Sequence, residues 1–145
     1  MKSITVIAFL FISGCAPVYA RDTHTTVAMT IWGEARNQSY AGKSAVASTI
    51  WNRAGGKPSK LSDVCLSRKQ YSCWQKRVFT QKLPDLRKTQ DRLAWRDCVT
   101  LASLMLNGSF LPDMTATHYH EASIRPYWAV NAPILASIGD HVFYK

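Results

Sequence analysis

The chain has 145 residues, and 47% of them are apolar. Lysine and arginine number 18 against nine aspartate and glutamate residues, so the formal net charge is +9. This length and apolar content suit one domain with a core of its own, which excludes a multidomain chain and a fold that depends wholly on disulfides. The positive charge favours an anionic partner: a cell-wall polymer, a membrane surface or nucleic acid.

Residues 1–20 resemble an export signal peptide. Lys2 supplies a positive start, residues 4–12 form an apolar segment, and residues 18–20 form a cleavage site. Cleavage there would leave one domain over residues 21–145. We therefore expect an exported protein of the periplasm or cell envelope, which argues against nucleic acid as the partner.

Two other interpretations of the leader stay open. The segment Ile12-Ser13-Gly14-Cys15 resembles a lipoprotein box, in which Cys15 would be acylated and would anchor the protein to a membrane. The leader could also be retained as an uncleaved anchor, although its apolar run is shorter than the ~20 residues of a spanning helix. In both cases membrane association would come through the leader.

Residues 26–36 are predicted to form the first helix, and Glu34 lies near its end. Val27, Ile31 and Glu34 fall at positions i, i+4 and i+7, so they share one helix face. Glu34 therefore ends an apolar stripe, in a chain whose only other glutamate is Glu121. Partial burial would raise the pKa of Glu34, which makes it a candidate for proton transfer.

The neighbours of Glu34 allow two interpretations. Gly33 has no side chain, and we expect it to leave room for a ligand beside a catalytic Glu34. In the alternative, Glu34 turns outward and pairs with Arg36 or Arg53. Spacing alone leaves both open.

The next predicted elements are short. A second helix is expected over residues 41–53 with Ser39 as its N-cap, and Ser62 is expected to cap a helical turn that ends at residue 65. Residues 68–74 form an irregular, aromatic-bearing loop, and such loops tend to carry function.

The second half of the chain combines a long helix with extended segments. Residues 91–106 show the strongest helical repeat and are predicted to be the central core helix, while Trp51 and Trp95 lie on helical stripes and are assigned to the core. Residues 115–120 and 142–144 are predicted to be extended. The predicted fold class is α+β and predominantly helical, with a small β-sheet or hairpin.

The cysteines of the exported domain allow at most one bridge. Cys65, Cys73 and Cys98 are an odd number, in a compartment where disulfides persist, and we favour pairing of Cys65 with Cys73 or Cys98. A metal site from Cys65, Cys73 and a histidine matches no common zinc spacing.

Two histidines lie near the end of the chain. His118 and His120 share one face of a predicted strand, and Tyr119 takes the other. They could bind a metal with His141 or Glu121 as a third ligand, but we favour two histidines that line a polar cleft. We therefore expect no metal and no cofactor.

Six sequence blocks together resemble the SleB/CwlJ-type cell wall hydrolases, the family of the spore cortex-lytic enzymes. The resemblance covers nearly all of residues 21–145. Each block alone is weak, but their shared order is hard to obtain by chance. The blocks are TIWGEAR (30–36), AVA with NR (45–47, 52–53), VC with QYSCW (64–65, 70–74), ATHYH (116–120), PYWA (126–129) and IGDHVFY (138–144).

This resemblance implies a lysozyme-like fold that acts on peptidoglycan, with Glu34 as the catalytic acid and base. The chain departs from the family pattern after Arg36, because Asn37 and Gln38 stand where a small and an acidic residue are common. A hydrolytic glycosidase usually needs two carboxyl groups. With one, a lytic transglycosylase is favoured, which cleaves between N-acetylmuramic acid and N-acetylglucosamine and releases a 1,6-anhydro sugar.

The family-matching blocks also suggest substrate-binding residues. Aromatic side chains could stack on sugar faces, although core packing is an equal alternative for each; these are Tyr71, Trp74, Tyr119 and Trp128. Polar side chains could hydrogen-bond N-acetyl groups or the developing charge; these are Gln70, Ser72, His118 and His120.

Rival functions remain at this stage. A hydrolytic muramidase would need a second carboxylate. An N-acetylmuramoyl amidase could use Cys73 with His118, but no thiol-activating block is recognisable. A non-catalytic basic wall-binding module would leave Glu34 structural. In each case the expected partner is peptidoglycan and the expected state is a monomer.

Overall fold

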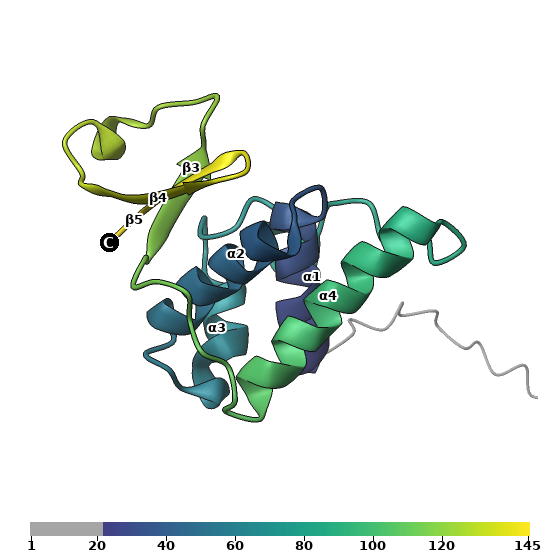
Figure 1. The fold of residues 1–145 in the computed structure, drawn as a ribbon. Helices are drawn as coiled ribbons and strands as arrows, with labels where there is room; N and C mark the ends of the chain where they lie inside the picture. The colour runs from purple at the N-terminus through teal and green to yellow at the C-terminus, as the bar shows by residue number, and fades with distance from the viewer. Residues whose placement is uncertain (1–21) are drawn as a thin grey trace, which may run out of the picture.

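The computed structural model describes residues 22–145, and the predicted leader lies outside them. The described part consists of helices and two small antiparallel sheets, so the predicted α+β class is confirmed (Figure 1). The helices are α1 (Thr23–Ala35), α2 (Tyr40–Arg53), α3 (Leu61–Cys65) and α4 (Thr89–Leu106), with short 3-10 turns at Pro58–Lys60 and Tyr127–Ala129. None of these helices is long and apolar enough to cross a membrane.

Helix α1 lies at the centre of the helical part. It starts three residues earlier than predicted, because the Asp22 carboxylate accepts a hydrogen bond from the Thr25 backbone N–H at 2.8 Å and caps the helix. Every residue from Thr26 to Trp32 is buried, and α2, α3 and α4 all pack against it. A helix that is buried on all sides belongs to the interior of the fold.

The prediction that the long helix is the central one is wrong. Helix α4 fully buries one face only, through Cys98, Leu101, Ala102 and Met105; the residues beside this face are partly buried and those opposite it are exposed. Its strong sequence repeat is the signature of a helix at the surface of the core. The core assignment of Trp95 is confirmed, since its ring packs edge-on against Trp32 at 6.1 Å.

The predicted N-cap of α2 is confirmed, and the predicted N-cap of α3 is wrong. Ser39 caps α2 by accepting a hydrogen bond from the Gly42 backbone N–H at 3.3 Å. Ser62 lies inside α3, whose N-cap is Lys60. The 3-10 turn before α3 runs directly into it, so no free helix end is left at Ser62 for a side chain to cap.

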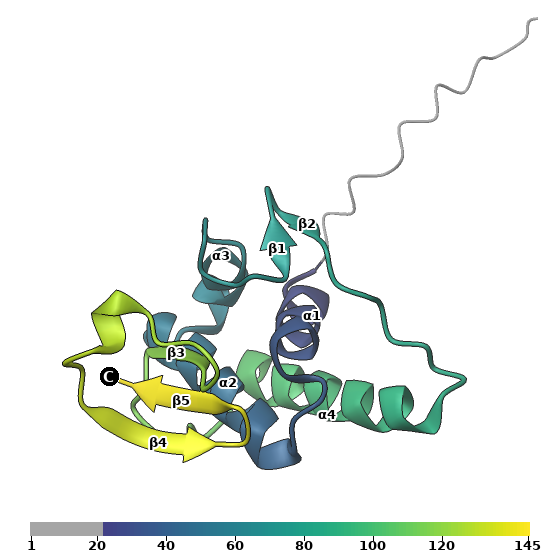
Figure 2. The ribbon, with the colours of Figure 1, turned by 90° about the horizontal axis from the view of Figure 1, so that it is seen from above.

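The larger sheet follows α4 and has the strand order β3-β5-β4. Strands β3 (His118–Glu121) and β5 (His141–Tyr144) match the predicted extended segments, and pair so that Tyr119 faces Phe143. Strand β4 (Ile134–Ile138) was not predicted, because it lies at the sheet edge and shows no buried alternation. The sheet lies at one side of α1 and α2 (Figure 2).

The smaller sheet is a hairpin beside α3. Its strands are β1 (Trp74–Gln75) and β2 (Val78–Phe79), which continue the loop that follows α3 (Figure 2). Two-residue strands are too short to give a period-two pattern, so the sequence does not predict them.

The predicted disulfide is wrong. Cys65, Cys73 and Cys98 are all free and buried. Each packs in the apolar core as a small hydrophobic side chain, and burial raises the pKa of Cys65 and of Cys98 to about 12. The thiolate that starts disulfide formation is therefore strongly disfavoured.

Candidate active site

A cleft of about 1310 Å³ opens beside the C-terminal end of α1. One wall is the loop of residues 66–77, the other is β3 with the segment that follows it, and residues 33–38 lie between them. This volume exceeds the ~300–1,000 Å³ of most small-molecule sites. The cleft therefore suits an extended ligand.

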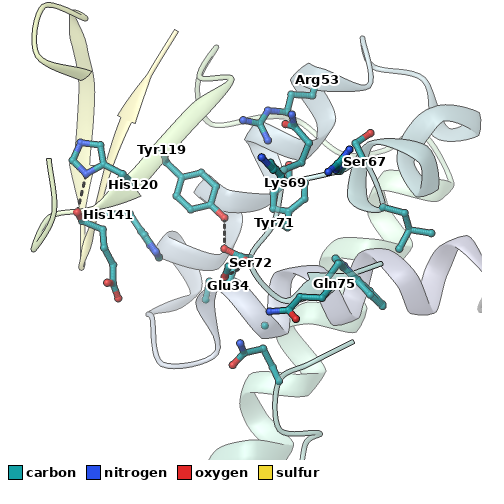
Figure 3. A pocket seen from close by; sticks show the side chains of 18 of the residues that line it. Glu34, Arg53, Ser67, Lys69, Tyr71, Ser72, Gln75, Tyr119, His120 and His141 are labelled. Carbon is teal, nitrogen blue, oxygen red and sulfur yellow. Dashed lines mark hydrogen bonds between the residues drawn. The ribbon is translucent and has the colours of Figure 1, made fainter. Parts of the chain in front are cut away.

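Glu34 lies in this cleft and accepts three hydrogen bonds. Its Oε1 accepts from the Ser72 hydroxyl at 3.1 Å and from the Cys73 backbone N–H at 3.0 Å, and its Oε2 accepts from the Tyr119 hydroxyl at 2.9 Å. Figure 3 shows the side chains of Glu34, Ser72 and Tyr119 meeting between the two walls. Since a carboxylate has about four acceptor positions, one is left for a proton or a ligand.

The alternative in which Glu34 forms a surface ion pair is wrong. The Arg36 side chain donates a hydrogen bond to the Gly33 carbonyl, and the Arg53 side chain donates one to the Thr117 carbonyl. Within residues 22–145 the ion pairs are Lys43–Asp97 and Arg87–Asp85, and neither involves Glu34. The carboxylate is thus held by neutral donors rather than by a cation.

Close packing of the 66–77 loop on α1 brings two of these donors, Ser72 and Cys73, to Glu34. The Trp74 indole N–H donates to the Thr30 hydroxyl at 2.8 Å, one helical turn before Glu34. A Cβ added to Gly33 would lie 2.9 Å from the Cys73 Sγ. Gly33 therefore makes room for the loop, and not for a ligand as the sequence suggested.

Tyr119 reaches Glu34 from the opposite wall. Burial, followed by the nearby Glu34 charge, raises the pKa of Tyr119 well above its ordinary 10.0. The hydroxyl therefore keeps its proton and remains a donor to Glu34. Its ring is flanked by His141 at 5.1 Å and by Phe143 at 5.6 Å, which fixes its direction.

The structure brings most of the predicted binding residues to the cleft, and only His118 is absent from its lining. The residues that line it are Gln70, Tyr71, Ser72, Trp74, Tyr119, His120 and Trp128. Tyr71 and Trp74 are only 2% and 8% exposed, which favours core packing for both rings. Trp128 is 38% exposed, so its ring remains open for contact with a ligand.

The two histidines of β3 already have partners. His120 bonds the Glu121 carbonyl through Nδ1 at 2.7 Å and the Tyr144 hydroxyl through Nε2 at 2.9 Å. His118 bonds the Thr117 hydroxyl at 2.9 Å, outside the cleft lining. Burial, and secondarily the Arg53 charge, lowers the pKa of His118. Contacts of His118 and His120 with a ligand stay predictions.

Two cleft residues were missed by the sequence argument. Arg53 lies over the Tyr71 ring at 5.4 Å, and its Nη1 is buried without a partner. His141 is 5% exposed, and its Nδ1 is also buried without a partner. Burial lowers the pKa of His141. The negative charges of Glu34, Glu121 and Asp140 nearby raise it, but by less. Both residues lie in sequence blocks that resemble the family, and this resemblance is the feature of the sequence that could have identified them as cleft residues.

The departure at residue 38 has a structural consequence. The Gln38 side-chain amide donates to the Asp140 carboxylate at 2.9 Å and accepts from the Asp140 backbone N–H at 3.1 Å. Gln38 thereby fastens the turn between β4 and β5 to the loop after α1. Of the other cleft carboxylates, Glu121 accepts from the Ser123 hydroxyl at 3.3 Å. Within residues 22–145, no three His, Cys, Asp or Glu side chains are grouped to hold a metal ion.

The family model described as Cell Wall Hydrolase matches residues 37–144. The chain belongs to the cell wall hydrolase family. The match begins after Glu34, so it does not include the residue that the site geometry singles out. Membership of this family implies peptidoglycan as the substrate. No curated protein matched the chain.

Two solved structures are similar in fold to this cell wall hydrolase. The catalytic domain of the germination-specific lytic transglycosylase SleB from Bacillus anthracis is 22% identical with a TM-score of 0.61, over 89% of this chain and 98% of that one. The catalytic domain of the Bacillus cereus SleB protein is also 22% identical, with a TM-score of 0.56 over 85% and 89%. The SleB-like catalytic-domain fold is thus confirmed.

Proposed function

We propose that this cell wall hydrolase is a lytic transglycosylase, which cleaves the bond between N-acetylmuramic acid and N-acetylglucosamine with Glu34 as its acid and base. The observation that carries the proposal is the set of three donors around the Glu34 carboxylate. One acceptor position of the carboxylate stays open for the proton that Glu34 gives up, and the three donors stabilise the ionised form that this transfer leaves behind. The SleB structure from Bacillus anthracis, itself named a lytic transglycosylase, supports the same assignment.

Glu34 performs two steps in this mechanism. Protonated Glu34 first gives its proton to the glycosidic oxygen, and the N-acetylglucosamine side leaves as that bond breaks. Its carboxylate, now held by Ser72, Cys73 and Tyr119, then takes the proton of the muramic acid 6-hydroxyl while that oxygen bonds to the anomeric carbon. The product is a 1,6-anhydro sugar, Glu34 is again protonated, and no water is consumed.

The other cleft carboxylates support this proposal over a hydrolytic muramidase. Asp140 is bonded to Gln38, and Glu121 is bonded to Ser123 within its own turn. A hydrolase would use a second carboxylate as nucleophile or to activate a water opposite Glu34, whereas the two hydrogen bonds of Asp140 to Gln38 give it a structural task at the β4–β5 turn. Each of the two carboxylates thus has a partner within the protein.

The amidase alternative is disfavoured by the state of Cys73. Burial, followed by the Glu34 charge, raises the pKa of the Cys73 thiol far above its ordinary 9.0. Its Sγ lies 4.0 Å from the Thr30 carbonyl, and His118 does not line the cleft. A buried neutral thiol without a base is a poor nucleophile.

Product analysis tests the proposal. Peptidoglycan treated with the wild-type protein should release anhydromuramyl fragments, seen by mass spectrometry, and Glu34→Gln should reduce their release at least ~1,000-fold because the acid is removed. Glu121→Gln is the matched control and should retain most activity. Reducing-end muramic acid would instead establish a hydrolytic muramidase. Export to the cell envelope remains a prediction from residues 1–20.

A further inference from the structure

The tip of the β1–β2 hairpin carries two cations in an unfavourable backbone conformation. Trp74 pairs with Phe79 and Gln75 with Val78, so the connecting loop is Lys76 and Arg77 alone. Their φ angles are 48° and 64°, the left-handed values of a type I′ turn. This turn strongly favours Asn-Gly, because glycine has no Cβ and the short polar side chain of asparagine tolerates left-handed angles, whereas lysine and arginine are strained there.

A third left-handed cation lies on the same wall. Lys69 has φ 60°, and it lines the cleft with Arg68, Lys76 and Arg77. All four side chains are exposed, and neither ion pair of residues 22–145 includes any of them. Four unpaired like charges repel one another. This repulsion and the backbone strain both lower the stability of the folded protein. Strain of this kind is typical of functional sites.

The positively charged hairpin lies close to the proposed catalytic residue. Ser72 and Cys73 bind Glu34, and β1 leads from them to the turn, so Lys76 lies about 10 Å along the chain from Cys73. The bond cleaved in the proposed function belongs to a muramic acid residue, and the peptide stem branches from that sugar. A stem that leaves the glycan at Glu34 therefore has this wall within reach. The stems of peptidoglycan carry free carboxylates.

We propose that Lys76 and Arg77, supported by Arg68 and Lys69, bind the carboxylates of the peptide stems and make this protein select stem-bearing peptidoglycan over bare glycan. This inference rests on the proposed function. The opposite wall carries the cleft acids Glu121 and Asp140, so an acidic stem is repelled there and attracted to the hairpin side.

The test compares two substrates: peptidoglycan strands with intact stems, and the same strands after enzymatic removal of the stems. The double variant Lys76→Asn/Arg77→Gly removes both charges and supplies the residues that the turn favours. Its preference for intact over bare strands, measured as the ratio of kcat/KM values, should fall about tenfold. Its Tm should rise by roughly 3 °C, which shows that the loss does not come from misfolding.

A matched control removes two cations elsewhere. Lys57 and Lys60 are exposed and lie outside the cleft lining, so Lys57→Gln/Lys60→Gln lowers the net charge equally and should keep the preference of the wild type. Added salt should reduce the wild-type preference, because exposed charge pairs are screened. An unchanged ratio in Lys76→Asn/Arg77→Gly, or an equal loss on both substrates, would overturn the proposal.

A binding measurement separates this inference from the proposed function. In the Glu34→Gln background, affinity for intact and bare strands is measured with and without the turn substitutions. If the wild-type protein cleaved no glycan, the proposed function would fail, yet a preference for intact strands that depends on Lys76 and Arg77 would still support the stem contact. Equal affinity for the two polymers would contradict it.

Discussion

The two walls of the cleft are held in place by different forces. On the helical side, Glu34 extends from the buried helix α1, and its donor Cys73 is itself wholly buried. On the sheet side, Phe143 of β5 is buried in the core, but β4 is largely exposed, and polar contacts also hold the strands to the helices. The Asn52 amide, for example, donates to the carbonyls of Met114 and Ala116 at 2.8 Å each, just before β3.

This difference separates the part of the site that is held rigid from the part that can move. Tight packing allows few alternative positions, so the acid and two of its donors are set by the core. Hydrogen bonds between exposed elements are individually worth about 1 kcal/mol, so the exposed part of the sheet wall, with Trp128, can adjust to a ligand. Core substitutions should therefore damage the site strongly, and polar substitutions on the sheet side should loosen it in small steps.

Among the substitutions that test this difference between the walls, the largest effect is expected from Gly33→Ala. The new methyl group would meet Cys73 and push the 66–77 loop from α1, which should cost about 1–3 kcal/mol of unfolding free energy and reduce activity by roughly 100-fold. Chemical denaturation and anhydro-product release would measure the two losses. The size-swapped Gly33→Ala/Cys73→Gly protein should recover part of both, and no recovery would argue against the steric explanation.

A smaller effect is expected from Tyr119→Phe on the sheet wall. It removes one of the donors to Glu34 and keeps the ring between His141 and Phe143. Activity should fall about 10-fold to 100-fold, with little change in Tm. As a comparison, Tyr127→Phe alters an exposed hydroxyl outside the cleft lining and should have no effect. A Tyr119→Phe enzyme with full activity would mean that this contact has no catalytic value.

A stability effect is expected from Gln38→Ala. The substitution removes both hydrogen bonds to Asp140 and frees the β4–β5 turn, which should lower the unfolding free energy by about 1–2 kcal/mol. Gln38→Glu should be similar, because it places a second negative charge beside Asp140. Thermal melts would measure both changes, and wild-type stability in either variant would show that the contact contributes nothing.

The smallest expected effect is a loss of stability in acid. Burial holds the pKa of His141 below its ordinary 6.5, and burial with the Arg53 charge does the same for His118. Below that value the unfolded chain binds more protons than the folded protein, so stability falls as the pH drops. The Tm should therefore decrease between about pH 7 and pH 5, and less so in His141→Gln. An equal decrease in both proteins would exclude His141 as a cause.

The sequence predicted features that arise from local patterns. The i, i+4, i+7 stripe placed Glu34 on α1, and Ser39 is the N-cap that its residue type suggested. The strands of His118 and His141 followed from runs of extended-type residues. What these features share is that their cause lies within a few neighbouring residues.

Features set by tertiary contacts could not be predicted in this way. The role of Gly33 depends on Cys73, which lies 40 residues later in the chain and meets α1 only in the fold. The central position of α1 was not predicted, because burial of its other faces depends on packing with α2, α3 and α4 that the local sequence does not show. The free cysteines likewise reflect their separate places in the core.

The most direct measurement of the central claim is peptidoglycan digestion in water enriched in heavy oxygen, followed by mass spectrometry of the new muramic acid ends. A transglycosylase that uses Glu34 alone passes the sugar to its own 6-hydroxyl, so the account predicts anhydro ends that contain no heavy oxygen and are absent in Glu34→Gln. Reducing ends that carry heavy oxygen would contradict it, because they require an attacking water and a second group to activate that water.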